Sequence, residues 1–381
     1  MEVRFLAQLA TLDKTRWNQL NHYNNPFLRY EFLAALERHG CVGEDSGWSA
    51  QHITLWRNDQ LIGALPMYIK QHSWGEFVFD WAWADAYARH GLAYYPKLVS
   101  AVPYTPVSGQ RFLALNDDPE IKTRLLSAVL EYAKANHYSS WHCLFPLAGE
   151  LEAATVPLRQ SLSERWGYQF HWRNHRYQSF DDYLATMASA KRKKIRRERR
   201  RIVEQDIEVE YLSGHQISTQ QWQVFYQYYL ATFAKKGNFP AFSLAFFQEL
   251  GARLPDQVLL ILARHRGRDV AGAFFMRNDS HLYGRHWGCL AEFDSLHFEL
   301  CYYAAIEYCI LNQLHYFEAG AQGEHKLSRG FLPVKTYSLH WIAHEGFRQA
   351  IDQFLLQERQ GVSDYIASAA AHSPFKMRFD Q

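Results

Sequence analysis

Six polar side chains that can act as acids, bases or anion ligands lie within twelve residues of this 381-residue chain. They belong to the stretch FEAGAQGEHKLSRGF and are Glu318, Gln322, Glu324, His325, Lys326 and Arg329. Carboxylates and imidazoles accept protons, and Lys and Arg side chains bind phosphates or a developing oxyanion. Gly320, Gly323 and Gly330 let the backbone turn sharply and approach a ligand closely. The stretch is either a site for acid–base chemistry or a solvated polar loop.

A helix and a short strand must position these side chains. Leu296 to Gln313 repeats apolar residues at helical spacing, and the strand Tyr316 to Ala319 follows it. A strand end that opens into a loop presents its side chain from a fixed scaffold. Glu318 and His325 are therefore the favoured proton acceptors, with Glu299 as a further candidate and a core or capping role for Glu318 as the alternative. The predicted substrate contacts here are Arg285, Gln322, Glu324, Lys326 and Arg329. Of these, Arg285, Lys326 and Arg329 could equally be exposed charges.

A second feature is a strongly basic segment, Lys191 to Arg201, which holds nine basic residues and the single acidic residue Glu198. The whole chain carries only +2, so the rest of it is mildly acidic. No Gly or Pro interrupts the segment, and we expect one helix from about residue 181 to 205. The helix is either a solvated face or a contact for phosphates of a cofactor, a diphosphate-linked precursor or RNA. Its candidate binding residues are Arg192, Arg196 and Arg197.

A tyrosine-rich segment in the first half of the chain is the third candidate region. It follows a strand predicted from Glu76 to Trp83 and reads WADAYARHGLAYYPKL. Charged and phenolic side chains alternate in it with aromatic ones, as in a binding loop, although a surface loop packed by its own aromatics is the alternative. Its candidate substrate contacts are Asp85, Tyr87, Arg89 and Lys97.

The order of elements predicts a tandem repeat. The hairpins LWRNDQLIGALPMY and ARHRGRDVAGAFFM share a turn and an apolar-Gly-Ala strand, with Gly63 and Gly272 in the same place. Each hairpin is followed by a strand, a helix and a last strand, and Glu164 to Phe180 adds strands at the junction. We expect a mixed α/β (α+β) fold with a central mixed β-sheet flanked by helices, divided into domains at 1–165 and 166–381.

Several classes of protein are not favoured by the sequence. Five cysteines without a C-x-x-C pair favour reduced thiols over a disulfide framework or a zinc site. The sequence lacks a signal-peptide pattern and a run of about 20 apolar residues, so a cytoplasmic protein without a membrane span is expected. Motifs of zinc hydrolases, serine hydrolases and P-loop enzymes are also absent from it.

The chain resembles the FemAB-like predicted N-acyltransferases. The resemblance rests on KRKKIRRERR, KKGNFPAF, LYGRHWG, LHFELCYY and FEAGAQGEHKLSRGFLPVKTYSLH in the second half, and on WADAYARHGLAYYPKL and VPYTPVSGQRFL in the first. That family is similar to the Fem peptidyltransferases, which have two domains of the GNAT acetyltransferase fold and transfer amino acids from aminoacyl-tRNA to peptidoglycan precursors. The resemblance therefore implies two tandem GNAT-like domains and N-acyl transfer to a small-molecule or peptide-like amine.

The resemblance also implies how the reaction proceeds. An amine attacks a thioester or an ester, with no metal. The candidate bases, which follow from the residues themselves and not from the resemblance, are Glu318, His325 and Glu299. The donor is acyl-CoA or aminoacyl-tRNA, because the glycine-rich pyrophosphate loop common in acetyl-CoA enzymes is missing from Trp287 to His297. Two alternatives stand beside this prediction: a Fem-type peptidyltransferase that uses aminoacyl-tRNA on a cell-wall precursor, and a non-catalytic protein that binds an anionic ligand.

Overall fold

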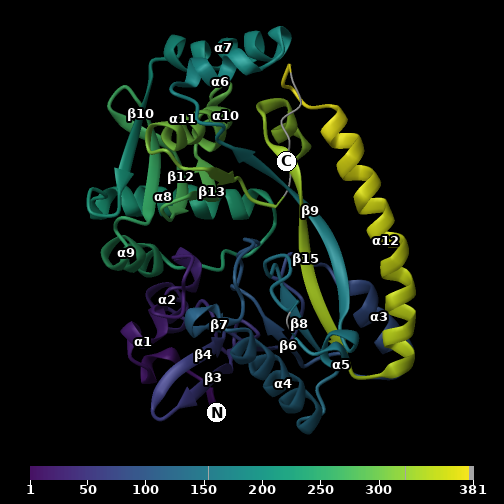
Figure 1. Cartoon of the computed structure of the whole chain (residues 1–381). Helices are drawn as coiled ribbons and strands as arrows, with labels where there is room; N and C mark the ends of the chain where they lie inside the picture. The colour runs from purple at the N-terminus through teal and green to yellow at the C-terminus, as the bar shows by residue number, and fades with distance from the viewer. Residues whose placement is uncertain (153, 322, 377–381) are drawn as a thin grey trace. The chain divides into compact units, whose positions relative to one another are not determined.

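The computed structural model describes residues 1–152, 154–321 and 323–376, and the chain forms two compact units (Figure 1). Unit 1 comprises Met1–Gly167 and Lys335–Asp364, and unit 2 comprises Tyr168–Val334 and Tyr365–Gln381. The units are therefore discontinuous in sequence, whereas the expected domains, 1–165 and 166–381, were continuous segments. Strands β9 (Ser163–Arg173) and β15 (Leu332–Ile342) each begin in one unit and end in the other.

One sheet of unit 1 is built on the first predicted hairpin. Its strand order is β1-β3-β4-β7, all antiparallel, and the bounds are β1 Glu2–Leu6, β3 His52–Arg57, β4 Gln60–Leu65 and β7 Leu113–Ala114. Helix α4 (Pro119–Ala135) packs on β3 and β4. A Cβ atom at Gly63 would lie 2.6 Å from the Ile121 side chain of α4. Glycine is therefore needed here for the close approach of the helix.

The other strands of unit 1 run in the order β15-β8-β6-β5-β2. Their bounds are β2 Trp48–Ala50, β5 Tyr68–Lys70, β6 Lys97–Ser100 and β8 Ser140–Leu144. Strands β6 and β8 are parallel, and β8 is antiparallel to β15. A small core of Trp83, Tyr87, Tyr94, Ile342, Ile351 and Leu355 joins α3 (Trp81–Arg89) to the first part of α12 (Glu345–Ala371).

Unit 2 is one mixed sheet with helices on both faces. The strand order is β10-β11-β12-β13-β14-β9, with β10 Ile207–Ser213, β11 Val258–His265, β12 Arg268–Arg277, β13 His281–Cys289 and β14 Tyr316–Glu318. Successive side chains of a strand point to opposite faces. Phe274 accordingly contacts Trp222 of α8 (Thr219–Lys235) and Phe247 of α9 (Leu244–Arg253), whereas Phe275 contacts Phe317 on the other face. Figure 1 shows α8 lying across β12 and β13.

The second face of the unit 2 sheet carries the helix predicted within Leu296 to Gln313. In the structure it consists of α10 (Leu296–Phe298), a π-helical turn (Glu299–Tyr303) and α11 (Ala304–Leu311). Leu300, Tyr303 and Ile306 pack there into the main core of the unit. Single π-helical turns are frequent at functional sites, and this one supplies Glu299, Tyr302 and Tyr303 to the region described below.

The remaining helices are short or peripheral. They are α1 Lys14–Asn18, α2 Tyr30–Arg38, α5 Val156–Gln160, α6 Phe180–Thr186 and α7 Ser189–Glu204, with 3-10 turns at Leu9–Thr11, Pro26–Leu28, Leu115–Asp117 and Glu324–Arg329.

Two of the predicted elements differ in the structure. The strand predicted from Glu76 to Trp83 is wrong: an irregular segment leads into α3, because Glu76 and Asp80 turn inward to bind a lysine. The single basic helix predicted at about 181–205 is also wrong, since extended backbone at Met187 and Ala188 separates α6 from α7. There the Ala188 N–H donates to the carbonyl oxygen of Pro374, and Met187 forms a bridge with Phe375.

The five cysteines are free thiols. In the described part of the chain, no helix combines the length and apolar character that a membrane crossing needs. Among the same residues, no group of three or more His, Cys, Asp or Glu side chains could hold a metal ion.

Candidate functional site

The candidate site of unit 2 lies where two parallel strands separate. Strands β13 and β14 pair only at His281↔Tyr316, Leu282↔Phe317 and Tyr283↔Glu318. Strand β14 then ends, and Gly320, with φ of 82°, turns the chain, while β13 continues to Cys289. The part of β13 beyond Tyr283 is thus an edge that β14 does not cover, and such an edge can hydrogen-bond an extended ligand.

Glu318 is the last residue of β14 and lies at this point of separation. It stands between Tyr283 on β13 and His171 on β9, and only 5% of it is exposed. Its Oε2 atom is 3.9 Å from Nε2 of His171. Burial, assisted by the charges of His281 and Lys326, lowers the pKa of His171 to about 3. His171 is therefore neutral near pH 7 and does not cancel the charge of the carboxylate.

Arg285 supplies the positive charge on the opposite strand. It lies two residues beyond Tyr283 on β13, and burial lowers its pKa to about 10, although the negative charge of Glu318 acts to raise it. Its neighbour His286 meets the rings of Tyr229 at 4.9 Å and Phe242 at 5.3 Å. The separated strands thus carry a carboxylate, a guanidinium and an aromatic wall.

The polar stretch after β14 forms a loop held from several sides. His325 Nε2 is 2.8 Å from the Tyr302 hydroxyl of the π-helical turn, and burial together with Arg329 and Lys326 lowers the pKa of His325. Lys326 is 1% exposed and donates to the carbonyl oxygen of Gly320 at 2.7 Å. Burial lowers the pKa of Lys326 to about 8. Glu324 accepts a hydrogen bond from Tyr365, and the predicted contact Gln322 lies outside the described residues.

Arg329 is an internal residue of this loop. Its Nε donates to the Tyr303 hydroxyl at 2.9 Å, its Nη2 to Glu198 Oε2 at 3.1 Å, and its Nη1 to the carbonyl oxygen of His325 at 3.0 Å. Its guanidinium also stacks on Phe298 at 3.5 Å. With 2% exposure, Arg329 fixes the backbone of the loop to α7 and the π-helical turn.

Glu299 is separate from this group. It is 3% exposed and binds Arg199 at 2.9 Å, and Arg199 also binds Glu307 at 2.8 Å. Burial raises the pKa of Glu299 even though Arg199 opposes the shift. The structure thus groups Glu318 with Arg285 and His171, and His325 with Lys326, and it places Glu299 in an ion pair with α7.

The basic residues of α7 divide into paired and unpaired charges. Arg196 binds Asp181 at 2.9 Å, and Arg201 binds Asp294. Arg197 is exposed and Arg192 is partly buried, and neither has an acidic partner among the described residues.

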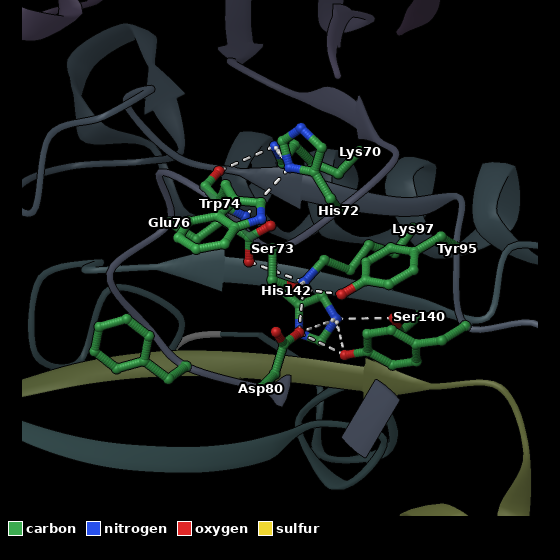
Figure 2. A network of polar contacts seen from close by, with 12 residues as sticks. Lys70, His72, Ser73, Trp74, Glu76, Asp80, Tyr95, Lys97, Ser140 and His142 are labelled. Carbon is green, nitrogen blue, oxygen red and sulfur yellow. Dashed lines mark hydrogen bonds and ion pairs between the residues drawn. The ribbon is translucent and has the colours of Figure 1, made fainter. Parts of the chain in front are cut away.

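The four residues of unit 1 that were predicted to contact substrate do not lie together. Asp85 and Arg89 are exposed on α3, while Tyr87 is buried and stacks on Phe347 with ring centroids 4.2 Å apart. Lys97 is fully buried. Its ammonium donates to Ser73 Oγ at 2.8 Å, to Glu76 Oε2 at 2.9 Å and to Asp80 Oδ2, as Figure 2 shows.

The partners of Lys97, which are Ser73, Glu76 and Asp80, were not predicted from the sequence. Burial raises the pKa of Glu76 to about 7, whereas Asp80 has its pKa lowered to about 2 by Lys97 and His142 against the effect of burial. The i, i+4 spacing of the two acids within the aromatic run SWGEFVFDW was the available signal, because acids in an apolar segment need buried partners.

The decisive comparison is with protein families. The model of the FemAB-like family, described as peptidoglycan biosynthesis/recognition, matches residues 8–377. The chain belongs to the FemAB-like family. The resemblance predicted from the sequence is thereby confirmed, and this FemAB-like protein is a transferase of the acyltransferase class.

Solved structures support the fold of this FemAB-like protein. FemX matches with a TM-score of 0.56 and 12% identity, over 92% of this chain and all of its own (100%). The C-terminal domain (DUF2156) of a protein assigned as a lysylphosphatidylglycerol synthetase from Agrobacterium fabrum gives a TM-score of 0.54 and 10% identity, over 92% of this chain and 98% of its own. The predicted fold class, mixed α/β with a mixed sheet flanked by helices, is confirmed. Among curated protein sequences, none matches this chain.

Proposed function

We propose that this FemAB-like protein is an N-acyltransferase that transfers an acyl or aminoacyl group to an amine, with Glu318 as the base. The observation that supports this proposal is the position of Glu318 at the separation of β13 and β14, beside a neutral imidazole and near the guanidinium of Arg285. A carboxylate held on a fixed strand end can take the proton of an incoming ammonium, directly or through a water molecule.

The steps of the reaction then follow. Glu318 removes a proton from the ammonium, and the freed amine nitrogen attacks the carbonyl carbon of a thioester or ester. The C–N bond forms, and Arg285 stabilises the oxyanion. The carbonyl then re-forms as the C–S or C–O bond to the donor breaks, and the leaving group takes the second proton that the nitrogen loses. The amide is released, and Glu318 passes the first proton to solvent. His325 and Lys326 lie on the loop that follows Glu318 and position the acceptor.

The donor binds along the uncovered edge of β13 in this proposal. Main-chain groups of an edge strand suit an extended, amide-bearing arm such as that of coenzyme A. The aminoacyl ester of a tRNA fits the same chemistry. The family description points to a peptide-like acceptor of peptidoglycan biosynthesis.

The substitution Glu318→Gln tests the proposal, because it keeps the shape of the side chain and removes the base. We expect amide formation, followed by mass spectrometry with a panel of acyl-CoAs, charged tRNAs and amines, to fall by about 10²–10⁴-fold. Glu208→Gln, at an exposed position of β10, is the matched control and should keep full activity. Wild-type activity in Glu318→Gln would exclude Glu318 as the base.

An aminoacyl-tRNA donor is the second candidate, favoured by the outer face of α7. Lys193, Arg197 and Arg200 are spaced i, i+4, i+7, so they share one face of the helix, and all three are exposed. None of them has an acidic partner within the residues that the structure describes. Phosphate contacts make binding strongly salt-dependent.

Salt dependence distinguishes this donor from acyl-CoA. Replacing Arg197 and Arg200 with Gln should weaken the binding of charged tRNA and reduce the slope of log K against log salt by about 0.7–0.9 for each phosphate that the variant no longer neutralises. Arg253→Gln, on the exposed part of α9, should leave the slope unchanged. Equal slopes in the wild type and the double variant would rule out this use of α7.

A further inference from the structure

The two units place comparable strands around a comparable position. In unit 2, β14 is parallel to β13 on one side and antiparallel to β9 on the other. Phe317 of β14 lies opposite Trp172, and Glu318 lies opposite His171. The candidate base thus faces the histidine of a His-Trp dipeptide on the neighbouring antiparallel strand.

Unit 1 repeats this arrangement. Strand β8 is parallel to β6 on one side and antiparallel to β15 on the other. Trp141 lies opposite Trp341, and His142 lies opposite His340, so a His-Trp dipeptide again faces the central strand. His142 therefore occupies in unit 1 the strand position that Glu318 occupies in unit 2.

His142 belongs to a closed hydrogen-bonded network (Figure 2). Its Nδ1 faces Nδ1 of His340, and its Nε2 lies 2.8 Å from Ser140 Oγ and 3.2 Å from the Tyr94 hydroxyl. Tyr94 in turn donates to Asp80 at 2.6 Å. Burial lowers the pKa of His142 to about 3, so the imidazole is neutral near pH 7. A neutral imidazole thus lies 3.8 Å from the Asp80 carboxylate, one of the two that hold Lys97.

The two carboxylates of this network, Glu76 and Asp80, already bind one ammonium group. The Lys97 ammonium occupies one oxygen of Glu76, one oxygen of Asp80 and the hydroxyl of Ser73. The second oxygens, Glu76 Oε1 and Asp80 Oδ1, accept no hydrogen bond from the described residues, although the two side chains are only 3% and 2% exposed. A buried carboxylate oxygen without a donor is costly, and an N–H donor from a ligand would remove that cost.

The segment that covers the network is held by charges. Ser73, Glu76 and Asp80 point inward, whereas Trp74, Phe77 and Phe79 are 64%, 39% and 58% exposed. Its large apolar side chains therefore face outward. Besides Lys97, two further cations hold its backbone: Lys70 donates to the carbonyl oxygen of Trp74 and Arg165 to that of Phe79. Such a segment can open without exposing a large apolar surface that is now buried.

We propose that this network is a second ligand site, in which Glu76 Oε1 and Asp80 Oδ1 bind a primary ammonium group under the segment from Ser73 to Asp80. The free carboxylate oxygens accept two N–H bonds of the ligand, and His142 Nε2 lies 3.8 Å from the other oxygen of Asp80, Oδ2. The identification of the ligand as the amine acceptor rests on the proposed N-acyltransferase function, but the binding of an ammonium group does not.

Calorimetric titration of the 381-residue chain with n-butylammonium chloride tests this site directly at about pH 8.5, above the pKa of about 7 to which burial raises Glu76. We expect saturable binding that falls at least about tenfold in Glu76→Gln, because this substitution removes a charge-assisted hydrogen bond. Glu120→Gln, at an exposed position of α4 outside the network, is the matched control and should bind as the wild type does. Tetramethylammonium chloride, which has no N–H donor, should not bind.

Hydrogen exchange of the wild type gives a readout that does not depend on a folded variant. Butylammonium should change the exchange of backbone amides in residues 73–80 more than elsewhere. Equal binding of the two ammonium ions, unchanged affinity in Glu76→Gln, or unchanged exchange at 73–80 would each overturn the proposal. Loss of amide formation in Glu318→Gln with intact butylammonium binding would separate this site from the proposed base of unit 2.

Discussion

At the scale of single residues, burial is the main cause of the shifted pKa values in two places, around Glu318 in unit 2 and in the Lys97 network of unit 1. Burial is the largest cause of the lowered pKa values of Lys326, His171 and His142. Lys70 shows the same effect beside the unit 1 network. It is fully buried, its ammonium lies 3.9 Å from the Trp48 ring and donates to the carbonyl oxygen of Trp74 at 3.2 Å, and burial lowers its pKa to about 7.

Lys70 makes stability depend on pH. Between about pH 7 and its ordinary pKa of 10.5, the unfolded chain holds a proton on Lys70 that the folded protein lacks. The free energy of unfolding therefore rises with pH in this window, by up to about 1.4 kcal/mol per pH unit. Lys70→Met keeps the packing over Trp48 and should flatten the rise between about pH 7 and 8, measured by urea unfolding, whereas Lys326, whose pKa is lowered to about 8, still causes a rise at higher pH. The exposed Lys134→Met should retain the rise between about pH 7 and 8, and an equally steep rise there in Lys70→Met would contradict this assignment.

Glu318 and the Lys97 network differ in how well the sequence predicts them. Glu318 could be placed at a strand end because the apolar strand and the polar loop are contiguous in the sequence. Of the Lys97 network, only the spacing of Glu76 and Asp80 left a signal in the sequence. The rest could not be predicted, because its members come from distant segments: His142 and His340 are 198 residues apart. The aromatic alternation around Glu76 also imitates a strand, and only the buried lysine explains why the segment turns inward.

At the scale of elements, α7 combines an apolar stripe that its sequence spacing shows with a contact that its sequence does not show. Ile195 and Ile202 are buried, as their helical spacing indicated. Glu198, the single acid of the basic run, is also buried and binds both Arg329 and Tyr303. The break before α7 depends on Pro374 and Phe375, which no local pattern could reveal. The buried ion pair between Glu198 and Arg329 therefore connects α7 to the loop after β14.

We therefore expect Glu198→Gln to lower the free energy of unfolding by much more than the loss of one surface charge would. It leaves the buried guanidinium of Arg329 without a counter-charge, and breaking a buried pair typically costs about 3–5 kcal/mol. Glu204→Gln, an exposed acid of the same helix, should change stability by less than about 0.5 kcal/mol. Urea unfolding measures both, and equal effects of the two substitutions would show that the Glu198–Arg329 pair does not hold the loop.

At the scale of the whole molecule, the chain passes between the two units along strands β9 and β15, each of which begins in one unit and ends in the other. Residues 335–364 belong to unit 1, although nearly all of unit 2 precedes them in the sequence. They supply the neighbour of β8 and four apolar core residues, Trp341, Ile342, Ile351 and Leu355, of which none is more than 6% exposed.

Unit 1 should therefore not fold from its first segment alone. Each of the four side chains contributes about 1.5–3 kcal/mol on burial, which together approaches the whole stability of a typical domain, about 5–15 kcal/mol. Without them β8 is also an edge strand with buried His142 and Cys143 exposed. A polypeptide of residues 1–167 should lack a near-UV circular dichroism signal and a cooperative unfolding transition, and adding a peptide of residues 335–364 should restore both. Cooperative unfolding of 1–167 by itself would show instead that unit 1 is a continuous domain.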